Sequence, residues 1–413
     1  MTATTVIVGA GQAGADLAVA LRQQSYPGRI LLIGEEPVVP YRRPPLSKGF
    51  LLGDVNEDAL CILSGEGYSK RGIELRTGLR VECIDRADHN LNLSDGSRVR
   101  YDNLALTTGG RARKLELPGV NRPNVHSVRT LADIRNLSEQ FKGGKRLVIV
   151  GGGYIGLEVA SVAVKTGLKV TLVESLPRLL ARVTGPELSQ YYAEVHRRNG
   201  VEIRLGASVC ALEGAEHVET VILQDGTRLP ADIVIVGIGL IPNTELAAQA
   251  GLAVDNGILV DLYARTSDPH IVAAGDCTNH VNGFLRCRVR LESVSNASEQ
   301  ARVAAATICG QHVAYASVPW FWSDQYNLKL QTVGLSQGYD RVVLRGVSTT
   351  DSFTAFYLKD GVVIAADSVN RPQDFVMARK IVAGRLRVNA AFLADETVPL
   401  KTFLTAGANT CNS

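Results

Sequence analysis

The sequence predicts an α/β fold that is built around two parallel-sheet domains. A Gly-x-Gly-x-x-Gly run occurs twice, at residues 9–14 and 151–156, and each copy follows a short apolar run and precedes a helical pattern. A chain of 413 residues is also too long for a single hydrophobic core, because a typical domain has roughly 150 residues. Two or three domains are therefore expected.

The first glycine run lies between two predicted strands. Thr5–Val8 is a short β-branched run, and residues 9–14 read Gly-Ala-Gly-Gln-Ala-Gly before the helical pattern. Ile30–Ile33 predicts a second buried strand that ends near Glu35, 21 residues beyond Gly14. This spacing places an acid where a ribose hydroxyl binds in a dinucleotide site.

Each glycine of this run has a physical role. Gly9 permits a tight turn, Gly11 lets the backbone approach a pyrophosphate, and Gly14 lets the helix pack closely on the strand. The helix N-terminus then faces the phosphates. A plain glycine turn is the alternative, but the flanking strand, helix and acid favour a Rossmann-like dinucleotide site.

The same arrangement returns in the middle of the chain. Arg146–Val150 predicts a strand that leads into the glycine run of residues 151–156 and a helix. Lys169–Val173 predicts the next strand, which ends at Glu174, 18 residues beyond Gly156. Two complete copies rarely arise by accident. The residues expected to bind the second nucleotide are Gly151, Gly153, Tyr154, Ile155, Gly156 and Glu174.

Glu174 also bears on the choice of nucleotide. Its carboxylate can accept hydrogen bonds from the adenosine ribose but repels a 2′-phosphate, so NADH is favoured over NADPH. Arg178, four residues later, is a cation that can soften this repulsion.

The charge balance and the cysteines exclude several classes of protein. Lys plus Arg number 44 against 41 for Asp plus Glu, and a net charge of +3 is too small to imply bulk nucleic-acid or membrane binding. The cysteines are odd in number and form no Cys-x-x-Cys, which favours a cytoplasmic protein with reduced thiols and no metal site. They are Cys61, Cys83, Cys210, Cys277, Cys287, Cys309 and Cys411.

Neither a secretory signal nor a membrane span is expected. Met1–Thr5 carries no basic side chain, and the apolar run after it breaks at Gly9. Leu147–Val164 is mostly apolar, but four glycines interrupt it and Glu158 would be buried in lipid. A buried strand, a turn and a helix are predicted there instead.

Two further segments each end an apolar strand in a small-residue turn, namely Leu104–Gly110 and Ile271–Asp276. Together with two fingerprints in this order, they resemble the two-dinucleotide-binding flavoprotein superfamily, whose fold is glutathione-reductase-like. In that superfamily the first fingerprint binds FAD and the second binds NAD(P). The resemblance covers almost the whole chain and implies FAD and NADH as cofactors.

Within the superfamily the sequence is most similar to the NADH-dependent ferredoxin reductases of the putidaredoxin reductase type. Four motifs carry this resemblance: Arg43-Pro44-Pro45-Leu46-Ser47-Lys48, Gly151–Glu158, Gly237-Ile238-Gly239-Leu240-Ile241-Pro242-Asn243 and Pro319-Trp320-Phe321-Trp322-Ser323-Asp324-Gln325. Enzymes of this family pass electrons to a small [2Fe-2S] ferredoxin, which serves a cytochrome P-450 monooxygenase or a ring dioxygenase. The resemblance implies the same reaction and partner for this chain.

The resemblance also implies three domains. They are an FAD-binding domain of residues 1–113 and 244–318, an inserted NADH-binding domain of residues 114–243, and a small α/β C-terminal domain of residues 319–413. The last contains strand-like runs at Arg341–Leu344 and Phe353–Ala366, the second turned at residues 359–361. A helical pattern follows from Gln373 onward.

The expected chemistry depends on a flavin without a cysteine partner. NADH gives up two electrons as a hydride, whereas an iron-sulfur ferredoxin accepts one at a time, so a flavin must mediate. Disulfide reductases and related peroxidases use cysteines beside the flavin, but Tyr41–Leu51 contains none. Two alternatives stay open here: an NADH oxidase, and an NADH-sensing flavoprotein of the apoptosis-inducing-factor type.

Lys48 and Glu158 are the catalytic candidates. By resemblance, Lys48 points at the flavin and pairs with a glutamate of the NADH-domain helix, which here is Glu158. The pair would lie between the two cofactors and balance charge as the flavin is reduced. The alternative is a surface salt bridge, contributing about 0–1 kcal/mol.

The remaining FAD contacts are implied by the resemblance. Asp276 would hold the ribityl chain, and Val294, at the entrance to a helix starting near Asn296, would present backbone N–H to the flavin pyrimidine edge. Ser295 and Asn296 are also candidates for the helix cap. The further expected cofactor contacts are Ala13, Glu35, Val81, Arg129, Gly239 and Trp320.

Aromatic and basic residues extend the prediction toward the partner. Trp320 and Trp322 are the only tryptophans, and core packing is the default for such residues, but the family places this segment near the flavin. Arg302 and Lys401 are either solvated surface charges or ferredoxin-docking residues.

Overall fold

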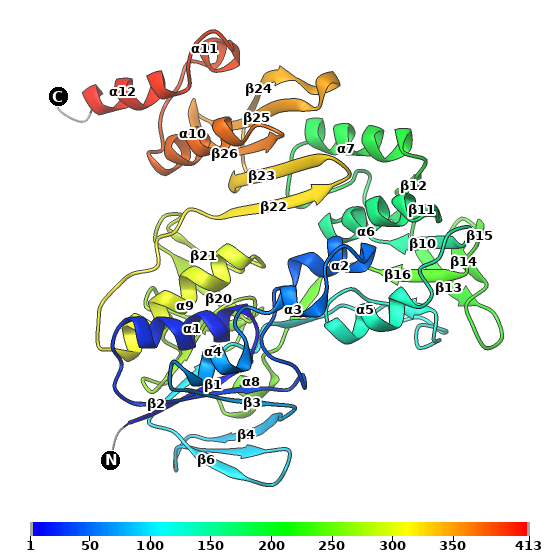
Figure 1. Cartoon of the computed structure of the whole chain (residues 1–413). Coiled ribbons are helices and arrows are strands. Elements are labelled where there is room, and N and C mark those ends of the chain that lie inside the picture. Colours follow the sequence, from blue (N-terminus) through cyan, green and yellow to red (C-terminus); the bar gives the residue numbers. More distant parts are fainter. Residues whose placement is uncertain (1–2, 411–413) are drawn as a thin grey trace. The chain divides into compact units, whose positions relative to one another are not determined.

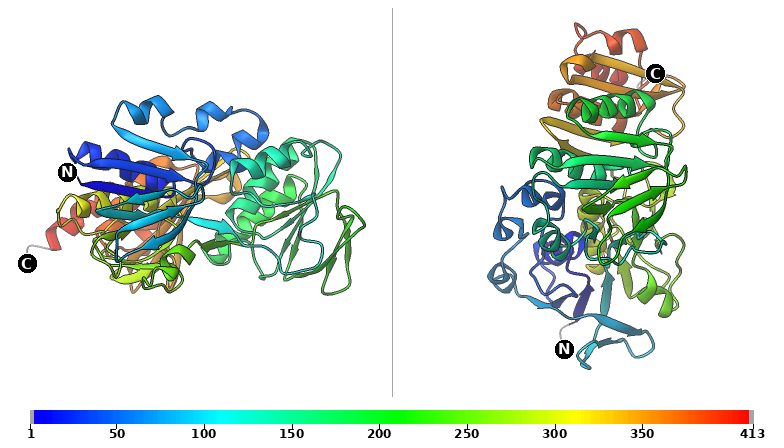
Figure 2. Two further views of the ribbon diagram at one scale, coloured as in Figure 1. Left: turned by 90° about the horizontal axis from the view of Figure 1, so that it is seen from below. Right: turned by 90° about the vertical axis from the view of Figure 1, so that its right-hand side faces the viewer.

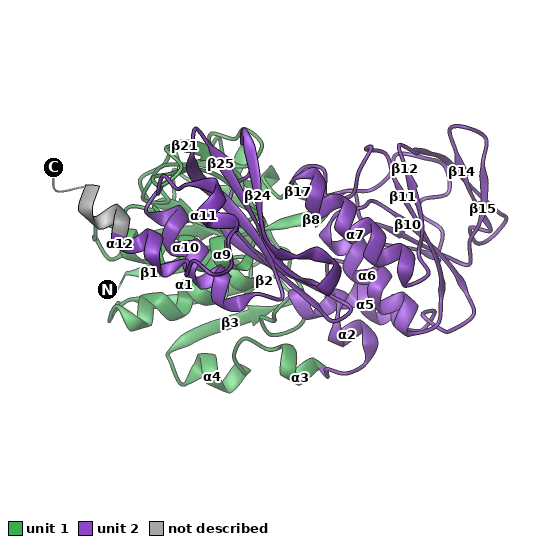
Figure 3. Ribbon diagram, turned by 90° about the horizontal axis from the view of Figure 1, so that it is seen from above, with its two compact units in different colours: residues 1–42, 57–111, 241–319 green, residues 43–56, 112–240, 320–413 purple. Residues whose placement is uncertain are grey.

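The structure, a computed structural model, describes residues 3–410. The chain forms two compact units (Figure 3). Unit 1 comprises residues 1–42, 57–111 and 241–319, and unit 2 comprises residues 43–56, 112–240 and 320–413. Each unit is therefore assembled from three separate stretches of sequence.

Unit 1 is centred on a five-stranded parallel sheet with two long helices. These elements are β1 (Thr4–Val8), β2 (Arg29–Gly34), β3 (Ile73–Thr77), β7 (Asn103–Leu106), β19 (Ile271–Ala273), α1 (Gln12–Gln23) and α9 (Val294–Ile308). The strand order is β19-β7-β1-β2-β3, and α1 packs against α9 (Figure 1). Ile7 joins the core cluster on the helix side, whereas Val6 and Val8 join the cluster on the other face. Both faces are buried, as a parallel sheet requires.

Smaller elements complete unit 1. Two three-stranded sheets have the orders β4-β5-β6 and β18-β20-β21, and three short helices lie outside them. Their bounds are β4 (Val81–Asp85), β5 (Asn90–Leu93), β6 (Arg98–Arg100), β18 (Ile258–Val260), β20 (Thr278–Asn282), β21 (Cys287–Val289), α3 (Glu57–Leu60), α4 (Gly65–Ser69) and α8 (Glu245–Gln249). Where the chain passes from one unit to the other, β8 (Gly110–Ala112) pairs with β17 (Leu240–Pro242).

Unit 2 repeats the parallel-sheet plan. Its elements are β9 (Val125–His126), β10 (Arg146–Val150), β11 (Lys169–Glu174), β12 (Glu202–Leu205), β16 (Ile233–Val236), α5 (Leu131–Ser138), α6 (Tyr154–Lys165) and α7 (Pro186–Arg198). The strand order is β12-β11-β10-β16-β9, all parallel. Figure 2 shows these teal and green strands and helices from two further sides. The small sheet of β13 (Val209–Glu213), β14 (Thr220–Leu223) and β15 (Arg228–Pro230) packs on Val148 and Val150.

The C-terminal part of unit 2 is a five-stranded antiparallel sheet of order β22-β23-β26-β25-β24. Its strands are β22 (Trp320–Gln325), β23 (Leu328–Gly334), β24 (Arg341–Val347), β25 (Ser352–Lys359) and β26 (Val362–Val369). The helices of this part are α10 (Pro372–Ala383), α11 (Ala390–Ala394), α12 (Lys401–Thr410) and the 3-10 turn η2 (Ser348–Thr350). Unit 2 also holds the 3-10 turn η1 (Pro44–Ser47) and α2 (Gly49–Leu52).

These elements agree with the expected secondary structure. The 147–164 stretch forms β10, a turn and most of α6, as expected. Within residues 3–410, no helix is both long enough and apolar enough to cross a bilayer. The three-domain division stays a prediction, because the compact units group residues 43–56 and the C-terminal sheet with the second parallel sheet.

Candidate cofactor-binding and redox site

The first glycine turn follows β1 and is fixed by close backbone contacts. Gly9 has φ +111°, and a Cβ there would lie 2.3 Å from the carbonyl oxygen of Thr107. A Cβ on Gly14 would lie 2.0 Å from the carbonyl oxygen of Gly9, so only glycine lets α1 approach the strand this closely. A Cβ on Gly11, by contrast, would meet no atom within 4 Å.

The open side of this turn is suited to a phosphate group. Gly11 is the N-cap of α1, and no side chain caps the helix, so its first N–H groups remain available to an anion. Ala13 is buried, and its Cβ is 3.0 Å from the position that a Cβ on Gly275 would take. These features fit the pyrophosphate of FAD.

The second glycine turn has the same steric plan. Gly151 has φ +115°, and a Cβ there would lie 2.3 Å from the carbonyl oxygen of Gly237. A Cβ on Gly156 would lie 2.1 Å from the carbonyl oxygen of Gly151, whereas Gly153 is open and caps α6 without a side chain. Ile155 is 42% exposed on the first turn of α6. A second nucleotide therefore fits here.

The acid that follows each turn behaves differently in the two units. Glu35 follows β2 and is exposed. Glu174 ends β11, where Oε2 accepts from the N–H of Gly152 at 2.6 Å and Oε1 accepts from the N–H of Leu176 at 2.8 Å. These bonds hold the Glu174 carboxylate beside the second glycine turn.

Arg178 does not neutralise Glu174. Its guanidinium donates to the carbonyl oxygens of Ala181 and Thr184 and to Oγ of Ser189, at 2.7–2.9 Å. In the described part of the chain, the hydrogen bonds of Arg178 go to these three oxygens, and Glu174 accepts from backbone N–H groups instead. Arg178 instead fastens the loop that follows β11.

Lys48 and Glu158 form an ion pair inside unit 2. Pro44 and Pro45 open the turn η1, and Lys48 follows directly after its last residue. Lys48 Nζ lies 2.9 Å from Oε1 of Glu158, and the two side chains are 18% and 2% exposed. The surface-salt-bridge alternative is therefore wrong, because Glu158 is buried on α6.

Two serines complete the surroundings of Glu158. Ser47 donates to Oε2 at 2.5 Å, and Ser323, on β22, donates to Oε1 at 2.7 Å. Burial raises the pKa of Glu158, while Lys48 and the two hydroxyls oppose that shift. Sequence reasoning missed both serines as functional residues, although each lies within a motif that carries the family resemblance.

The other predicted FAD residues occupy several elements of unit 1. Val81 is buried at the start of β4, Asp276 follows β19, and Val294 is the first residue of α9. The prediction that Ser295 or Asn296 caps α9 is wrong. The cap is Ser293, whose Oγ accepts from the N–H of Asn296 at 3.1 Å. The helix begins two residues earlier than expected, so the cap moves with it.

Arg129, Gly239 and the tryptophans belong to unit 2. The carbonyl oxygen of Arg129 accepts from Nη1 of Arg43 at 2.6 Å. Gly239 has φ +108°, and a Cβ there would meet no atom within 4 Å. The rings of Trp320 and Trp322 stack at 5.6 Å on β22, and both residues are only partly buried. The Arg379 guanidinium lies 5.4 Å from the Trp320 ring centroid.

The proposed docking residues are both exposed. Arg302 pairs with Glu299 on the surface of α9 at 3.1 Å, and its side chain is 62% exposed. Lys401 is exposed at the start of α12. They lie in different units, and among residues 3–410 neither forms a hydrogen bond or ion pair with a predicted cofactor residue.

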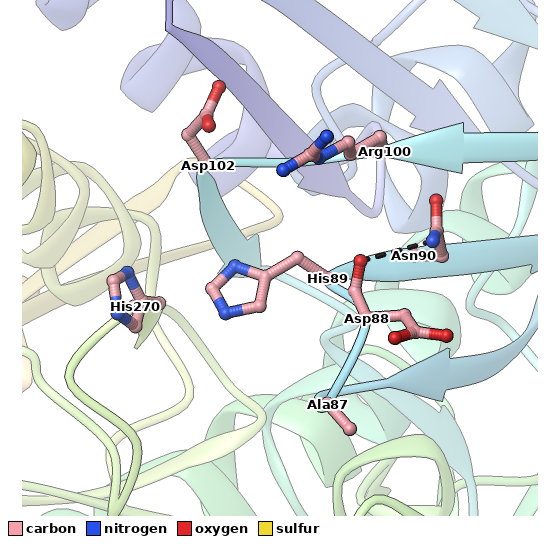
Figure 4. A pocket seen from close by; sticks show the side chains of 7 residues that line it. All are labelled: Ala87, Asp88, His89, Asn90, Arg100, Asp102 and His270. Atoms are coloured by element: carbon pink, nitrogen blue, oxygen red, sulfur yellow. Dashed lines mark hydrogen bonds between the residues drawn. The ribbon is translucent and has the colours of Figure 1, made fainter.

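A cavity of about 530 Å³ lies in unit 1, and no residue of the first glycine turn lines it (Figure 4). His89 and His270 face each other across it, with ring centroids 4.7 Å apart. None of its lining residues was predicted to bind a cofactor. The lining consists of Ala87, Asp88, His89, Asn90, Arg100, Asp102 and His270.

The described cysteines do not provide a redox relay. All six are free, and Cys411 lies outside the described residues. Cys277 follows Asp276 directly, but burial raises its pKa to about 11, so its thiol stays protonated at neutral pH. In residues 3–410, no group of acidic, histidine and cysteine side chains is arranged to hold a metal ion.

Family models match most of the chain. The pyridine nucleotide-disulphide oxidoreductase model matches residues 3–301, and the reductase C-terminal model matches residues 320–404. The chain belongs to the pyridine nucleotide-disulphide oxidoreductase family. Members of this family use FAD and NAD(H), so the predicted cofactors and the predicted glutathione-reductase-like fold class with its C-terminal domain are confirmed.

Several of the proteins most similar to this chain are ferredoxin reductases. Putidaredoxin reductase CamA of Pseudomonas putida is 46% identical, over 97% of this chain and 96% of that protein. The 5,5'-dehydrodivanillate O-demethylase ferredoxin reductase subunit of a Sphingobium species is 45% identical, over 97% of this chain and 98% of that protein. A chain in the crystal structure of the covalent putidaredoxin reductase-putidaredoxin complex matches with a TM-score of 0.95 at 45% identity, over 98% of this chain and 99% of that chain. The present chain is therefore an oxidoreductase of the ferredoxin reductase type.

Proposed function

We propose that this chain takes a hydride from NADH onto FAD and passes single electrons to a [2Fe-2S] ferredoxin, which serves a cytochrome P-450 monooxygenase or a ring dioxygenase. The observation that carries the proposal is the pair of Lys48 with the buried Glu158, which lies two residues beyond the second glycine turn. The motif around Lys48 contains no cysteine. The choice of a ferredoxin as the electron acceptor is based on the names of the similar proteins, which are ferredoxin reductases.

In unit 1, the first glycine turn binds the FAD pyrophosphate through the uncapped start of α1. Bound FAD supplies the step from two-electron to one-electron chemistry. Asp276 and Val294 hold the ribityl chain and the pyrimidine edge, and the other contacts of the FAD set are Gly9, Gly11, Ala13, Gly14, Glu35, Val81 and Arg129.

In unit 2, the second glycine turn binds NADH, with Glu174 accepting from the adenosine ribose. Arg178 is occupied by three oxygens of its own loop, so the charge of Glu174 disfavours a 2′-phosphate. Gly239 and Trp320 complete this set. Lys48 and Glu158 balance charge when the flavin is reduced, because a cation near the developing negative charge stabilises it.

The ferredoxin is held by exposed cations, with Arg302 and Lys401 as the named candidates. Reversal of either charge, in Arg302→Glu or Lys401→Glu, raises the KM for ferredoxin about 3- to 10-fold, because rim charges act mainly on association. NADH oxidation by an artificial acceptor stays unchanged. Lys142→Glu, at another exposed lysine, is the matched control. Unchanged ferredoxin kinetics in both test variants would dismiss the two residues.

Anaerobic stopped-flow spectroscopy tests the proposed reaction. The FAD-loaded protein is mixed with NADH and then with the [2Fe-2S] ferredoxin of a monooxygenase system. Fast bleaching by NADH followed by fast one-electron reoxidation by ferredoxin is the expected result. A long-lived bleached complex that ferredoxin cannot reoxidise would contradict it and favour an oxidase or a sensor.

We also propose a cytoplasmic location for the protein, because all six described cysteines are free thiols.

A further inference from the structure

We propose that Ser47 and Ser323 are positioning residues that clamp the Glu158 carboxylate, and that a hydrogen-bonded chain starting at Tyr326 keeps Ser323 in its donating orientation. This inference rests on the proposed function, because it concerns the charge of the Lys48–Glu158 pair. It adds to that function a set of residues that act on the pair through hydrogen bonds to Glu158.

The clamp uses both oxygens of the carboxylate. Ser47 donates to Oε2 of Glu158 at 2.5 Å, while Ser323 donates to Oε1 at 2.7 Å. Lys48 Nζ approaches the same Oε1 at 2.9 Å. Ser47, Glu158 and Ser323 are 2%, 2% and 0% exposed, so water cannot replace a missing hydroxyl at low cost.

The clamp continues into a chain of side chains, of which Gln325 and His196 are buried and Tyr326 is partly buried. Gln325 Nε2 lies 3.2 Å from Ser323 Oγ, and Gln325 Oε1 lies 2.9 Å from His196 Nε2. His196 Nδ1 lies 3.0 Å from the hydroxyl of Tyr326. Gln325 and His196 are 1% and 0% exposed, and β22, α7 and the residue after β22 supply the members of the chain.

One direction of donation satisfies every link. The single proton of Ser323 goes to the carboxylate, so its oxygen accepts from the Gln325 amide. The Gln325 carbonyl then accepts from Nε2–H of His196, whose Nδ1 accepts from the Tyr326 hydroxyl. Burial lowers the pKa of His196 to about 4, which agrees with a neutral ring at pH 7. All donors therefore point toward Glu158, and each bond polarises the next.

The chain orients hydrogen bonds and does not conduct protons, because an amide does not pass a proton along. Its effect is on Glu158 itself, which pairs with Lys48 at 2.9 Å and whose charge helps to raise the pKa of the Tyr154 phenol on the same helix. Loss of a donor removes a bond that favours the charged carboxylate, so the pKa of Glu158 rises further. The ion pair with Lys48 is then lost at a higher pH than in the wild type.

Infrared difference titration of the FAD-loaded protein, labelled with 13C-glutamate, tests the clamp without turnover. The Glu158 band is identified by its absence in Glu158→Gln. In Ser323→Ala and Ser47→Ala, the pKa of Glu158 is expected to rise by about one unit each, and in Gln325→Leu by less. Ser323→Thr keeps a hydroxyl and restores the wild-type value. Ser368→Ala, at another buried serine of the same sheet, leaves it unchanged.

Anaerobic stopped-flow measurements across pH supply the second readout. The acid limb of flavin reduction by NADH is expected to move upward in Ser323→Ala by the same shift as the infrared titration. Unchanged Glu158 titrations in Ser47→Ala and Ser323→Ala would overturn the proposal. Should Ser323→Ala fail to fold, Ser47→Ala decides alone. A wild type that NADH does not bleach would refute the proposed function, and the infrared titration would still decide the clamp.

Discussion

The first helices of the two parallel sheets carry an acid at the same place, two residues beyond the last glycine of each turn. In α1 this acid is Asp16, which accepts from Gln12 Nε2 at 2.8 Å and from Ser298 Oγ at 2.5 Å. In α6 it is Glu158, which is buried and paired with Lys48. The same position in the repeat thus ties two helices together in unit 1 and holds an ion pair in unit 2.

The two acids have different partners, although the glycine turns before them have the same geometry. The glycine contacts that shape the two turns agree to within 0.1 Å, with Cβ clashes of 2.0 and 2.1 Å at Gly14 and Gly156. The two turns therefore provide equivalent nucleotide frames. Asp16 has only neutral donors in its recorded contacts among the described residues, whereas Glu158 has a cation and two buried hydroxyls. The proposed redox role of Lys48 and Glu158 therefore depends on contacts that only the second frame has.

The largest effect is expected from substitutions at the last glycine of each turn. Gly156→Val places a side chain against the Gly151 carbonyl oxygen, so NADH-driven flavin reduction falls about 1000-fold, since such a clash costs more than about 4 kcal/mol. FAD content stays at the wild-type level. Gly14→Val places a side chain against the Gly9 carbonyl oxygen in the first turn, so the purified protein is expected to contain no FAD. The ratio of flavin to protein absorbance measures this loss.

Gly153→Ala is the matched control for Gly156→Val, because its Cβ meets no atom within 4 Å and the fold is preserved. It weakens only nucleotide binding. Wild-type NADH kinetics in Gly156→Val would show that the second turn is not a nucleotide frame.

The next effect concerns a buried acid that forms no ion pair with any residue that the structure describes. Asp367 accepts from Thr184 Oγ1 at 2.5 Å and from the Tyr357 hydroxyl at 2.7 Å, and burial raises its pKa to about 6. Since this folded-state pKa exceeds the unfolded one, near 3.8, its contribution to stability is present at low pH and is lost as pH rises from about 4 through about 6. The loss amounts to about 2–3 kcal/mol.

Asp367→Asn removes that titration. Its free energy of unfolding relative to the wild type is expected to improve between pH 4 and pH 7, as measured by urea unfolding at both pH values. Asp360→Asn, in the exposed turn between β25 and β26, is the control and should follow the wild type. Parallel pH profiles for all three proteins would mean that Asp367 has an ordinary carboxyl titration despite its burial.

A smaller effect sharpens the comparison of the two ribose-side acids. Glu174→Ala removes the carboxylate that would repel a 2′-phosphate, so the ratio of kcat/KM for NADPH to that for NADH rises about tenfold. Glu202→Ala, at an exposed acid on the neighbouring strand, leaves the ratio unchanged. An unaltered ratio in Glu174→Ala would assign the nucleotide preference to other residues.

The sequence was sufficient for the repeated frame because local rules determine it. Glycine spacing, the flanking strands and the ribose-side acids follow from residues close together in the chain. Ser323 reaches Glu158 from 165 residues away, and Arg178 turns to oxygens of its own loop. Such partners depend on tertiary packing, which no local pattern encodes.

The α9 cap shows the same limit at a smaller scale. Three polar residues in a short run, Ser293, Ser295 and Asn296, are all able to cap a helix, and the choice depends on where the helix begins. The sequence pointed to Ser295 or Asn296, but the cap is Ser293, because α9 begins at Val294. The pairing of Lys48 with Glu158 was predicted, whereas the serine donors to Glu158 were not.

The most direct test of the comparison is the rate of flavin bleaching by NADH in Glu158→Gln and Asp16→Asn, measured by anaerobic stopped flow on fully FAD-loaded protein. Glu158→Gln is expected to slow bleaching about 100-fold, because the charge that balances Lys48 is gone. Asp16→Asn should stay within about threefold of the wild type, since an amide oxygen still accepts from Gln12 or Ser298. Equal rates in the two variants would contradict the assignment of redox function to the second frame.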